Sequence, residues 1–205
     1  MEKVKAPKVF RHMQVCKACS LHKKRKNVVV GRGNYRHAYI MIVGEGPGED
    51  EDKSGMPFVG RAGEKLEELL NESGIDKDII YITNAVKCRP MSGGRNRPPT
   101  NLEIRKCSPH LELQISVLQP KIIVVLGNVA LQYFCPDLKI LSSRGKLLTS
   151  KKTRAKIFPI IHPAASFRHE DWEELIRQDL SELKRLVSSG ELDKRDVVFG
   201  PRQIG

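Results

Sequence analysis

The stretch Gly44-Glu45-Gly46-Pro47-Gly48 follows the apolar run 38–43, and it decides how this chain is expected to fold. The run is typical of a buried strand, and a glycine-rich turn after such a strand often cradles a phosphate. Here the proline removes a main-chain donor and no Gly-Lys-Ser/Thr follows. A phosphate would also be repelled by the acidic residues Glu45, Glu49, Asp50, Glu51 and Asp52. We therefore expect a tight turn that presents the Glu45 carboxylate at the end of a strand, with the ring of Phe58 returning beside it.

The rest of the chain repeats the pattern of strand followed by helix. Apolar, β-branched runs that resemble buried parallel strands occupy residues 39–43, 79–83, 122–126 and 157–161. Between them lie a leucine stripe that ends before Gly74, a capping box at Thr100-Asn101-Leu102-Glu103 and, last, an amphipathic helix at about 170–188. This order predicts an α/β fold: a three-layer α/β/α sandwich around a four-stranded parallel sheet.

The predicted fold forms one domain over residues 1–188, followed by a weakly apolar tail at 189–205 that is mobile or laid over the surface. A basic segment stiffened by prolines, 92–99, is expected to be a loop outside the core. The 205 residues suffice for one sizeable core.

The formal net charge of +12 indicates an acidic partner, and nucleic acid is the leading candidate. The alternative is the lysine-rich surface of a heat-adapted protein. No apolar run is long enough to span a membrane, and the basic segment 1–14 lacks the apolar centre of a signal peptide. We therefore expect no membrane partner and a cytoplasmic, nucleoid-associated location.

Four of the five cysteines suggest a metal site. Cys16 and Cys19 form a close pair, and Cys88 and Cys107 lie far along the chain beside basic residues. Four thiolates suit zinc or an iron–sulfur cluster, and the spacing does not choose between them. Cys135, in an apolar context, fits a plain buried thiol.

Polar side chains follow the predicted strands, where ligands bind in open α/β sheets: Glu45, Asn84, Asn128 and His162. Taken singly, the asparagines fit turn or cap residues and the histidine fits a satisfied core residue. Together with Phe58 they suggest a pocket for a flipped pyrimidine. An amide reads its polar edge, a ring stacks on it, an imidazole stabilises the departing anion, and a carboxylate supports the sugar centre. These are the parts needed to cleave an N-glycosidic bond.

The segments 44–48, 55–63 (Gly-Met-Pro-Phe-Val-Gly-Arg-Ala-Gly), 83–90 (Thr-Asn-Ala-Val-Lys-Cys-Arg-Pro) and 162–165 (His-Pro-Ala-Ala) carry a family resemblance. In them the chain resembles the family 4 uracil-DNA glycosylases, the iron–sulfur enzymes of thermophilic bacteria and archaea. The resemblance extends over about residues 10–188.

The resemblance implies a role for each matching residue. Glu45 would be the catalytic carboxylate and His162 the stabiliser of the leaving anion, with uracil bound by Gly44, Gly46, Phe58 and Asn84. A [4Fe–4S] cluster would be held by Cys16, Cys19, Cys88 and Cys107. DNA contacts are expected from Arg95 and Arg97 in the basic loop. They are also expected from Phe167 or Arg168, which stand where related enzymes often place a wedging leucine.

We therefore predict a monomeric, monofunctional uracil-DNA glycosylase that acts on single- and double-stranded DNA and leaves an abasic site. One alternative is a non-catalytic iron–sulfur protein of the same fold that binds nucleic acid. Another is a zinc-stabilised nucleotide-binding module. A sliding clamp is a further candidate partner, although segment 199–204 has no clear clamp-binding motif.

Overall fold

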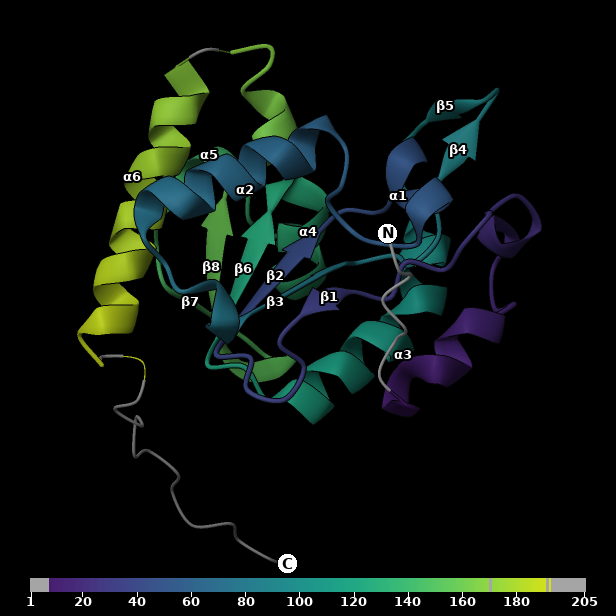
Figure 1. The fold of residues 1–205 in the computed structure, drawn as a ribbon, viewed down its shortest axis with the longest axis horizontal. Helices are drawn as coiled ribbons and strands as arrows, with labels where there is room; N and C mark the ends of the chain where they lie inside the picture. Colours follow the sequence, from purple (N-terminus) through teal and green to yellow (C-terminus); the bar gives the residue numbers. More distant parts are fainter. Residues whose placement is uncertain (1–7, 170, 191, 193–205) are drawn as a thin grey trace, which may run out of the picture.

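The computed structural model describes residues 8–169, 171–190 and 192, and its centre is a six-stranded sheet (Figure 1). The strand order is β1-β3-β2-β6-β8-β7. The four inner strands run parallel: β2 (Ile40–Gly44), β3 (Ile80–Asn84), β6 (Ile122–Leu126) and β8 (Thr153–Ile160). They confirm the predicted parallel strands, although β8 begins earlier than expected.

The expected number of strands was too small, because a short antiparallel strand borders each edge of the sheet. β1 (Arg32–Gly33) pairs with β3, and β7 (Leu148–Ser150) pairs with β8. Because β1 and β7 are not fully buried, they lack the continuous apolar run by which the inner strands were predicted.

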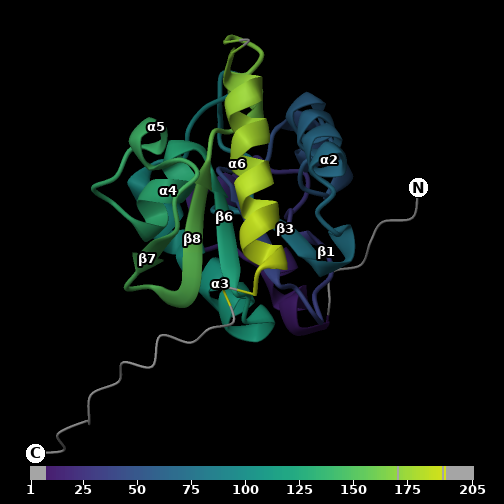
Figure 2. The same ribbon diagram turned by 90° about the vertical axis from the view of Figure 1, so that its left-hand side faces the viewer.

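Helices cover both faces of the sheet, which confirms the α/β/α sandwich (Figures 1 and 2). α2 (Arg61–Ser73) and α6 (Asp171–Ser188) lie together on one face, where Lys65 pairs with Glu173 at 3.1 Å. α3 (Asn101–Leu118) and α4 (Gly127–Phe134) lie on the other face. From α3, the buried Gln114 amide donates to the Tyr81 hydroxyl of β3 at 3.0 Å.

Local sequence explains where these helices begin and end. The leucine stripe of α2 is buried, and Gly74 ends the helix in the left-handed conformation, with φ of 64°. α3 begins with the predicted capping box. The Thr100 hydroxyl accepts the Glu103 N–H at 3.2 Å, and the Glu103 carboxylate accepts the Thr100 N–H at 2.7 Å.

Several short elements surround this frame. Segment 92–99 is not a plain loop, because its first part forms a hairpin of β4 (Met91–Ser92) and β5 (Arg95–Asn96). Gly93 and Gly94, with φ of 55° and 78°, supply the left-handed turn that a two-residue hairpin needs. The others are η1 (Lys8–Val15), η2 (Ser20–Lys23), α1 (Glu49–Ser54), η3 (Lys77–Ile79), α5 (Ile140–Ser143) and η4 (Pro163–Ala165).

Across the described ranges, no helix is both long and apolar enough to cross a membrane. Most of the expected tail 189–205, including segment 199–204, lies outside the described residues. The boundary of the domain at residue 188 therefore stays a prediction.

Candidate active site and cysteine cluster

A cavity of about 620 Å³ opens at the carboxyl edge of the sheet, and side chains far apart in sequence line it together. Glu45 directly follows β2, Asn84 is the last residue of β3, and His162 follows β8. Phe58, from the loop between α1 and α2, completes the group. The volume is in the range of small-ligand sites, so the structure brings these four predicted residues together around one pocket.

The topology explains this convergence. In the sheet, β2 lies between β3 and β6. The chain leaves β2 for β3 on one flank of this strand and later returns to β6 on its other flank, so a topological switch point begins at β2. The expectation for Asn128 was wrong, since its Oδ1 accepts the Ile140 N–H at 2.9 Å and it does not line the cavity. It anchors the start of α5, which is an ordinary structural use of asparagine.

Gly44 and Gly46 lie where no side chain fits. A Cβ on Gly44 would lie 2.5 Å from Asn84 Oδ1 and 2.6 Å from Phe58 Cζ. A Cβ on Gly46 would lie 2.7 Å from a methyl group of Val86. The glycines thus let the strand end approach the amide and the ring closely.

The Phe58 loop is held by the Glu51 carboxylate, whose sequence context predicted only that it would repel a phosphate. Glu51 Oε1 accepts the N–H groups of Val59 and Gly60 at 3.1 and 3.0 Å, and its Oε2 accepts the Gly48 N–H at 3.0 Å. Phe58 itself has φ of 54°, which is uncommon for a residue with a side chain. Glu51 therefore joins the two loops that border the cavity and fixes the ring in an otherwise unfavourable backbone geometry.

The His162 ring is fixed in orientation and is neutral at physiological pH. Its Nδ1 accepts the Ala164 N–H at 3.2 Å, which leaves the proton of the neutral ring on Nε2. Burial lowers the pKa of His162 to about 4. The ring stacks against Phe58 with centroids 5.9 Å apart. The arrangement offers the cavity an uncharged N–H donor.

Glu45 lies on the turn after β2, and that turn is hydrogen-bonded to the turn after β3. The Ala85 N–H donates to the Gly44 carbonyl at 2.8 Å, and the Val86 N–H donates to the Glu45 carbonyl at 3.2 Å. Burial raises the pKa of the Glu45 carboxyl, which makes the carboxylate a stronger base than an exposed one. Asn84, only 2% exposed, lies beside it with an amide that both donates and accepts.

The residues predicted to touch DNA lie around the mouth of the cavity or near it. Arg97 and Arg168 line the cavity, but Arg97 is also paired with Glu103 at 2.7 Å. Arg95 is exposed on the hairpin. Phe167 is 43% exposed, and the Arg61 guanidinium lies over its ring at 4.7 Å. Contact with DNA stays a prediction for all of the expected residues.

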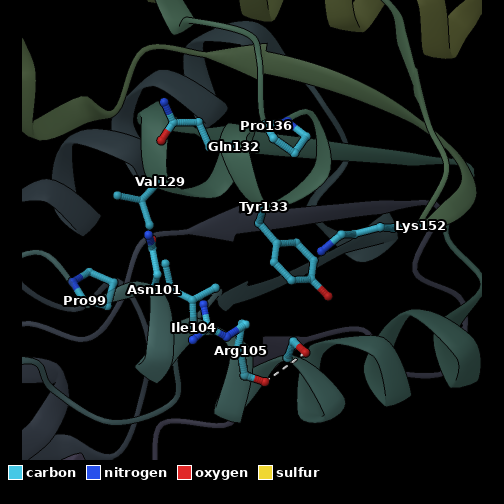
Figure 3. A pocket seen from close by; sticks show the side chains of 10 residues that line it. Pro99, Asn101, Ile104, Arg105, Val129, Gln132, Tyr133, Pro136 and Lys152 are labelled. Carbon is cyan, nitrogen blue, oxygen red and sulfur yellow. Dashed lines mark hydrogen bonds between the residues drawn. The ribbon is translucent and has the colours of Figure 1, made fainter.

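A second hollow, of about 400 Å³, lies between α3 and α4 (Figure 3). Its walls include Arg105 from α3 and Tyr133 from α4, and the Lys152 amine lies 3.8 Å from the centre of the Tyr133 ring. None of the predicted site residues lines this hollow. Its one aromatic lining residue is Tyr133, and Lys152 lies over the Tyr133 ring, where a base would have to stack. The cavity at the carboxyl edge is therefore the better candidate for the active site.

The four predicted metal-binding cysteines line one small cavity: Cys16, Cys19, Cys88 and Cys107. Basic side chains share that cavity, and the Arg25 guanidinium lies 3.5 Å from Cys88 Sγ. The Lys87 main-chain N–H donates to Cys107 Sγ at 3.3 Å. Burial raises the pKa of Cys88 to about 11, against the opposing effect of Arg25. Such cationic and N–H donors stabilise thiolates, so the donor set suits a metal centre with four thiolate ligands.

Among residues 8–169, 171–190 and 192, no group of three or more His, Cys, Asp or Glu side chains is arranged to hold one metal ion. The identity of the metal centre therefore stays a prediction. Cys135 lies apart from them, and its thiol donates to the Thr149 carbonyl.

Comparison with known proteins shows the family of this chain. The family model of the uracil DNA glycosylase superfamily matches residues 30–184. A type-4 uracil-DNA glycosylase of Thermotoga maritima is 43% identical over 183 residues, which cover 87% of this chain and 93% of that relative. Another, of Sulfurisphaera tokodaii, is 40% identical over 188 residues, which cover 88% and 84%. The chain therefore belongs to the uracil-DNA glycosylase superfamily and, within it, to the type-4 uracil-DNA glycosylases.

Proposed function

We propose that this protein excises uracil from DNA by hydrolysing the N-glycosidic bond, and that it leaves an abasic site. The observation that carries this proposal is the meeting of Glu45, Phe58, Asn84 and His162 around one cavity of suitable size. Membership in the type-4 family, whose relatives are named for this activity, supports the same substrate.

Recognition of the base is assigned to Asn84 and Phe58. The Asn84 amide would donate to O4 of uracil and accept from N3–H, a pattern that the cytosine edge reverses. The ring of Phe58 would stack on the base. Because Gly44 has no Cβ, both side chains can approach the end of β2 closely.

Cleavage is assigned to His162 and Glu45. As the bond between the sugar C1′ and the base N1 breaks, its electron pair leaves with uracil, and the neutral His162 Nε2–H donates to the developing negative charge on O2. Glu45 would stabilise the positive charge on the sugar and accept a proton from the water that attacks C1′. The products are the uracil anion, which then takes up a proton from solvent, and a sugar that carries a hydroxyl at C1′. Glu45 returns the proton of the attacking water to the solvent.

The same site favours a monofunctional enzyme. Cutting of the backbone by a glycosylase usually needs an amine nucleophile, and no described lysine lines the cavity. Lys87 is near, but its amine is buried behind Asn84. We therefore expect an uncut strand after uracil release.

The substrate is assigned as uracil in single- or double-stranded DNA. In a duplex the base must be flipped out at a cost of a few kcal/mol. The net charge of +12 and the arginines near the cavity would offset this cost through phosphate contacts. Phe167 or Arg168 is proposed as the residue that fills the gap left in the duplex by the flipped base. The protein is proposed to act as a monomer at the nucleoid.

The cysteine cavity is proposed to hold a [4Fe–4S] cluster through Cys16, Cys19, Cys88 and Cys107. Four thiolates with surrounding cations and an N–H donor match the needs of such a centre. When bound, the cluster would cross-link the N-terminal segment, the turn after β3 and α3. No step of the glycosylase reaction is assigned to it.

Uracil release from a labelled single-stranded oligonucleotide tests the proposal, with wild type beside Glu45→Gln and His162→Ala. We expect release by the wild type and losses of about a hundredfold or more in both variants, each with its iron content unchanged. If the wild type binds DNA but releases no uracil, the proposal is wrong and the non-catalytic alternative holds.

A further inference from the structure

Lys87 has a position that the proposed reaction leaves unexplained. It is only 1% exposed, although lysine is rarely buried without a partner. Its Nζ donates to the Asn84 carbonyl and to the Thr83 hydroxyl, both at 2.7 Å. Its own main-chain N–H donates to Cys107 Sγ at 3.3 Å. One residue therefore contacts both a cysteine of the cluster cavity and the residue proposed to read uracil.

The surroundings of this amine indicate what compensates its burial. Within the part of the chain that the structure describes, no carboxylate forms an ion pair with Lys87. Lys87 also lines the cysteine cavity, where four thiolates of a bound cluster would supply negative charge. Asn84 and Thr83 supply the hydrogen bonds that a buried amine requires.

The hydrogen bonds from Lys87 also extend to the catalytic turn. Thr83 Oγ1 contacts the Val30 carbonyl at 2.8 Å, which anchors the end of β3. Val86, two residues after Asn84, donates its N–H to the Glu45 carbonyl. A displacement of this turn would therefore move the uracil-reading amide and the Glu45 loop together.

We propose that Lys87 is a positioning residue that couples the cysteine cluster to the uracil pocket by fixing the main chain of Asn84. The proposal rests on the proposed function, since it assigns Asn84 to uracil. Lys87 does not contact the base. It sets the direction of the amide that does, and the cysteine cavity holds Lys87 in turn.

The test compares Lys87→Met with Lys106→Met. The methionine keeps most of the volume and removes the donor. Lys106 lines the same cysteine cavity but is exposed, and the structure gives it no contact with Asn84, so it is a matched control for charge beside the cluster. The readout is binding of two single-stranded oligonucleotides that differ at one position, 2′-fluoro-deoxyuridine or 2′-fluoro-deoxycytidine. The fluorine slows cleavage of the glycosidic bond, so the readout is affinity and not turnover. Iron content and visible absorbance are measured for each variant.

The expected result is that Lys87→Met keeps its iron and its affinity for the cytidine strand, while its preference for the uridine strand falls about tenfold. Lys106→Met should keep the wild-type preference. An unchanged preference in Lys87→Met, or an equal fall in Lys106→Met, would overturn the inference.

A third variant, Lys87→Gln, keeps the test decisive if the methionine variant loses iron. Glutamine retains an N–H donor without the charge, so it should restore much of the preference for uridine. If Lys87→Gln keeps iron but has no preference, or if both variants lose their iron, the proposed coupling through a donor to Asn84 is wrong. Uracil release by the wild type is measured in parallel, and its absence would count against the proposed function instead.

Discussion

Replacing Gly44 with alanine should damage uracil excision while leaving the fold intact. The added Cβ would lie 2.5 Å from Asn84 Oδ1 and 2.6 Å from Phe58 Cζ, so each group must move by about 1 Å to reach ordinary contact. Gly44 does not have a positive φ, so the backbone tolerates alanine. The strain therefore falls on the two side chains that are proposed to hold the base.

Overpacking of this kind costs about 1–3 kcal/mol. If that cost falls on the bound transition state, kcat/KM decreases about 5- to 150-fold. The assay is single-turnover release of uracil from a single-stranded oligonucleotide, with the midpoint of thermal unfolding measured on the same samples. We expect the midpoint to fall by only a few degrees, since the cavity gives both side chains room to move.

Gly60→Ala is the matched control. Gly60 lines the same cavity and has φ of −91°. Its Cβ would meet the end of the Asp50 side chain at 3.0 Å and Glu51 Oε1 at 3.5 Å, and the second of these is an ordinary contact. It should retain wild-type kcat/KM within about threefold. The reasoning is refuted if Gly44→Ala excises uracil as fast as Gly60→Ala, or if it loses activity only because it unfolds.

Three further predictions concern pH, the cysteines and salt. The rate should fall as pH falls through the raised pKa of Glu45, and the same acid limb should persist in the residual activity of His162→Gln, because an imidazole with a pKa of about 4 is already neutral there. A limb that disappears in that variant would contradict these assignments. Cys88→Ala should lose iron and visible absorbance, whereas Cys135→Ala should retain both; equal loss would remove the distinction between the two cysteines. Arg168→Ala should lower the slope of log affinity for single-stranded DNA against log salt by about 0.7, and an unchanged slope would exclude a phosphate contact.

The sequence predicted the frame and the pocket because both depend on the ends of buried strands. Continuous apolar runs identify the four parallel strands, and their carboxyl ends must meet at one edge of the sheet. Glu45, Asn84 and His162 are found there for that reason. Asn128 has the same position in the pattern, but its side chain turns to the Ile140 N–H, and chain position alone does not reveal that choice.

The sequence did not predict the elements and side chains that lack a periodic pattern of apolar residues. β1 and β7 are two and three residues long, and α1 is an acidic helix whose one buried residue is Asp52. The Asp52 carboxylate accepts two main-chain N–H groups at 2.9 and 3.2 Å, so its burial is polar and does not produce an apolar stripe. Glu51 and Lys87 were missed for a related reason. A charged side chain that folds inward to bind main-chain groups has the same sequence pattern as one that faces water.

The most direct test of the account is a crystal structure of the iron-loaded protein with free uracil. The account predicts uracil in the cavity at the carboxyl edge, stacked on Phe58, with its O4–N3 edge on the Asn84 amide and O2 within hydrogen-bond distance of His162 Nε2. Uracil bound in the hollow between α3 and α4, or in the predicted cavity without contact to Asn84 and His162, would contradict it.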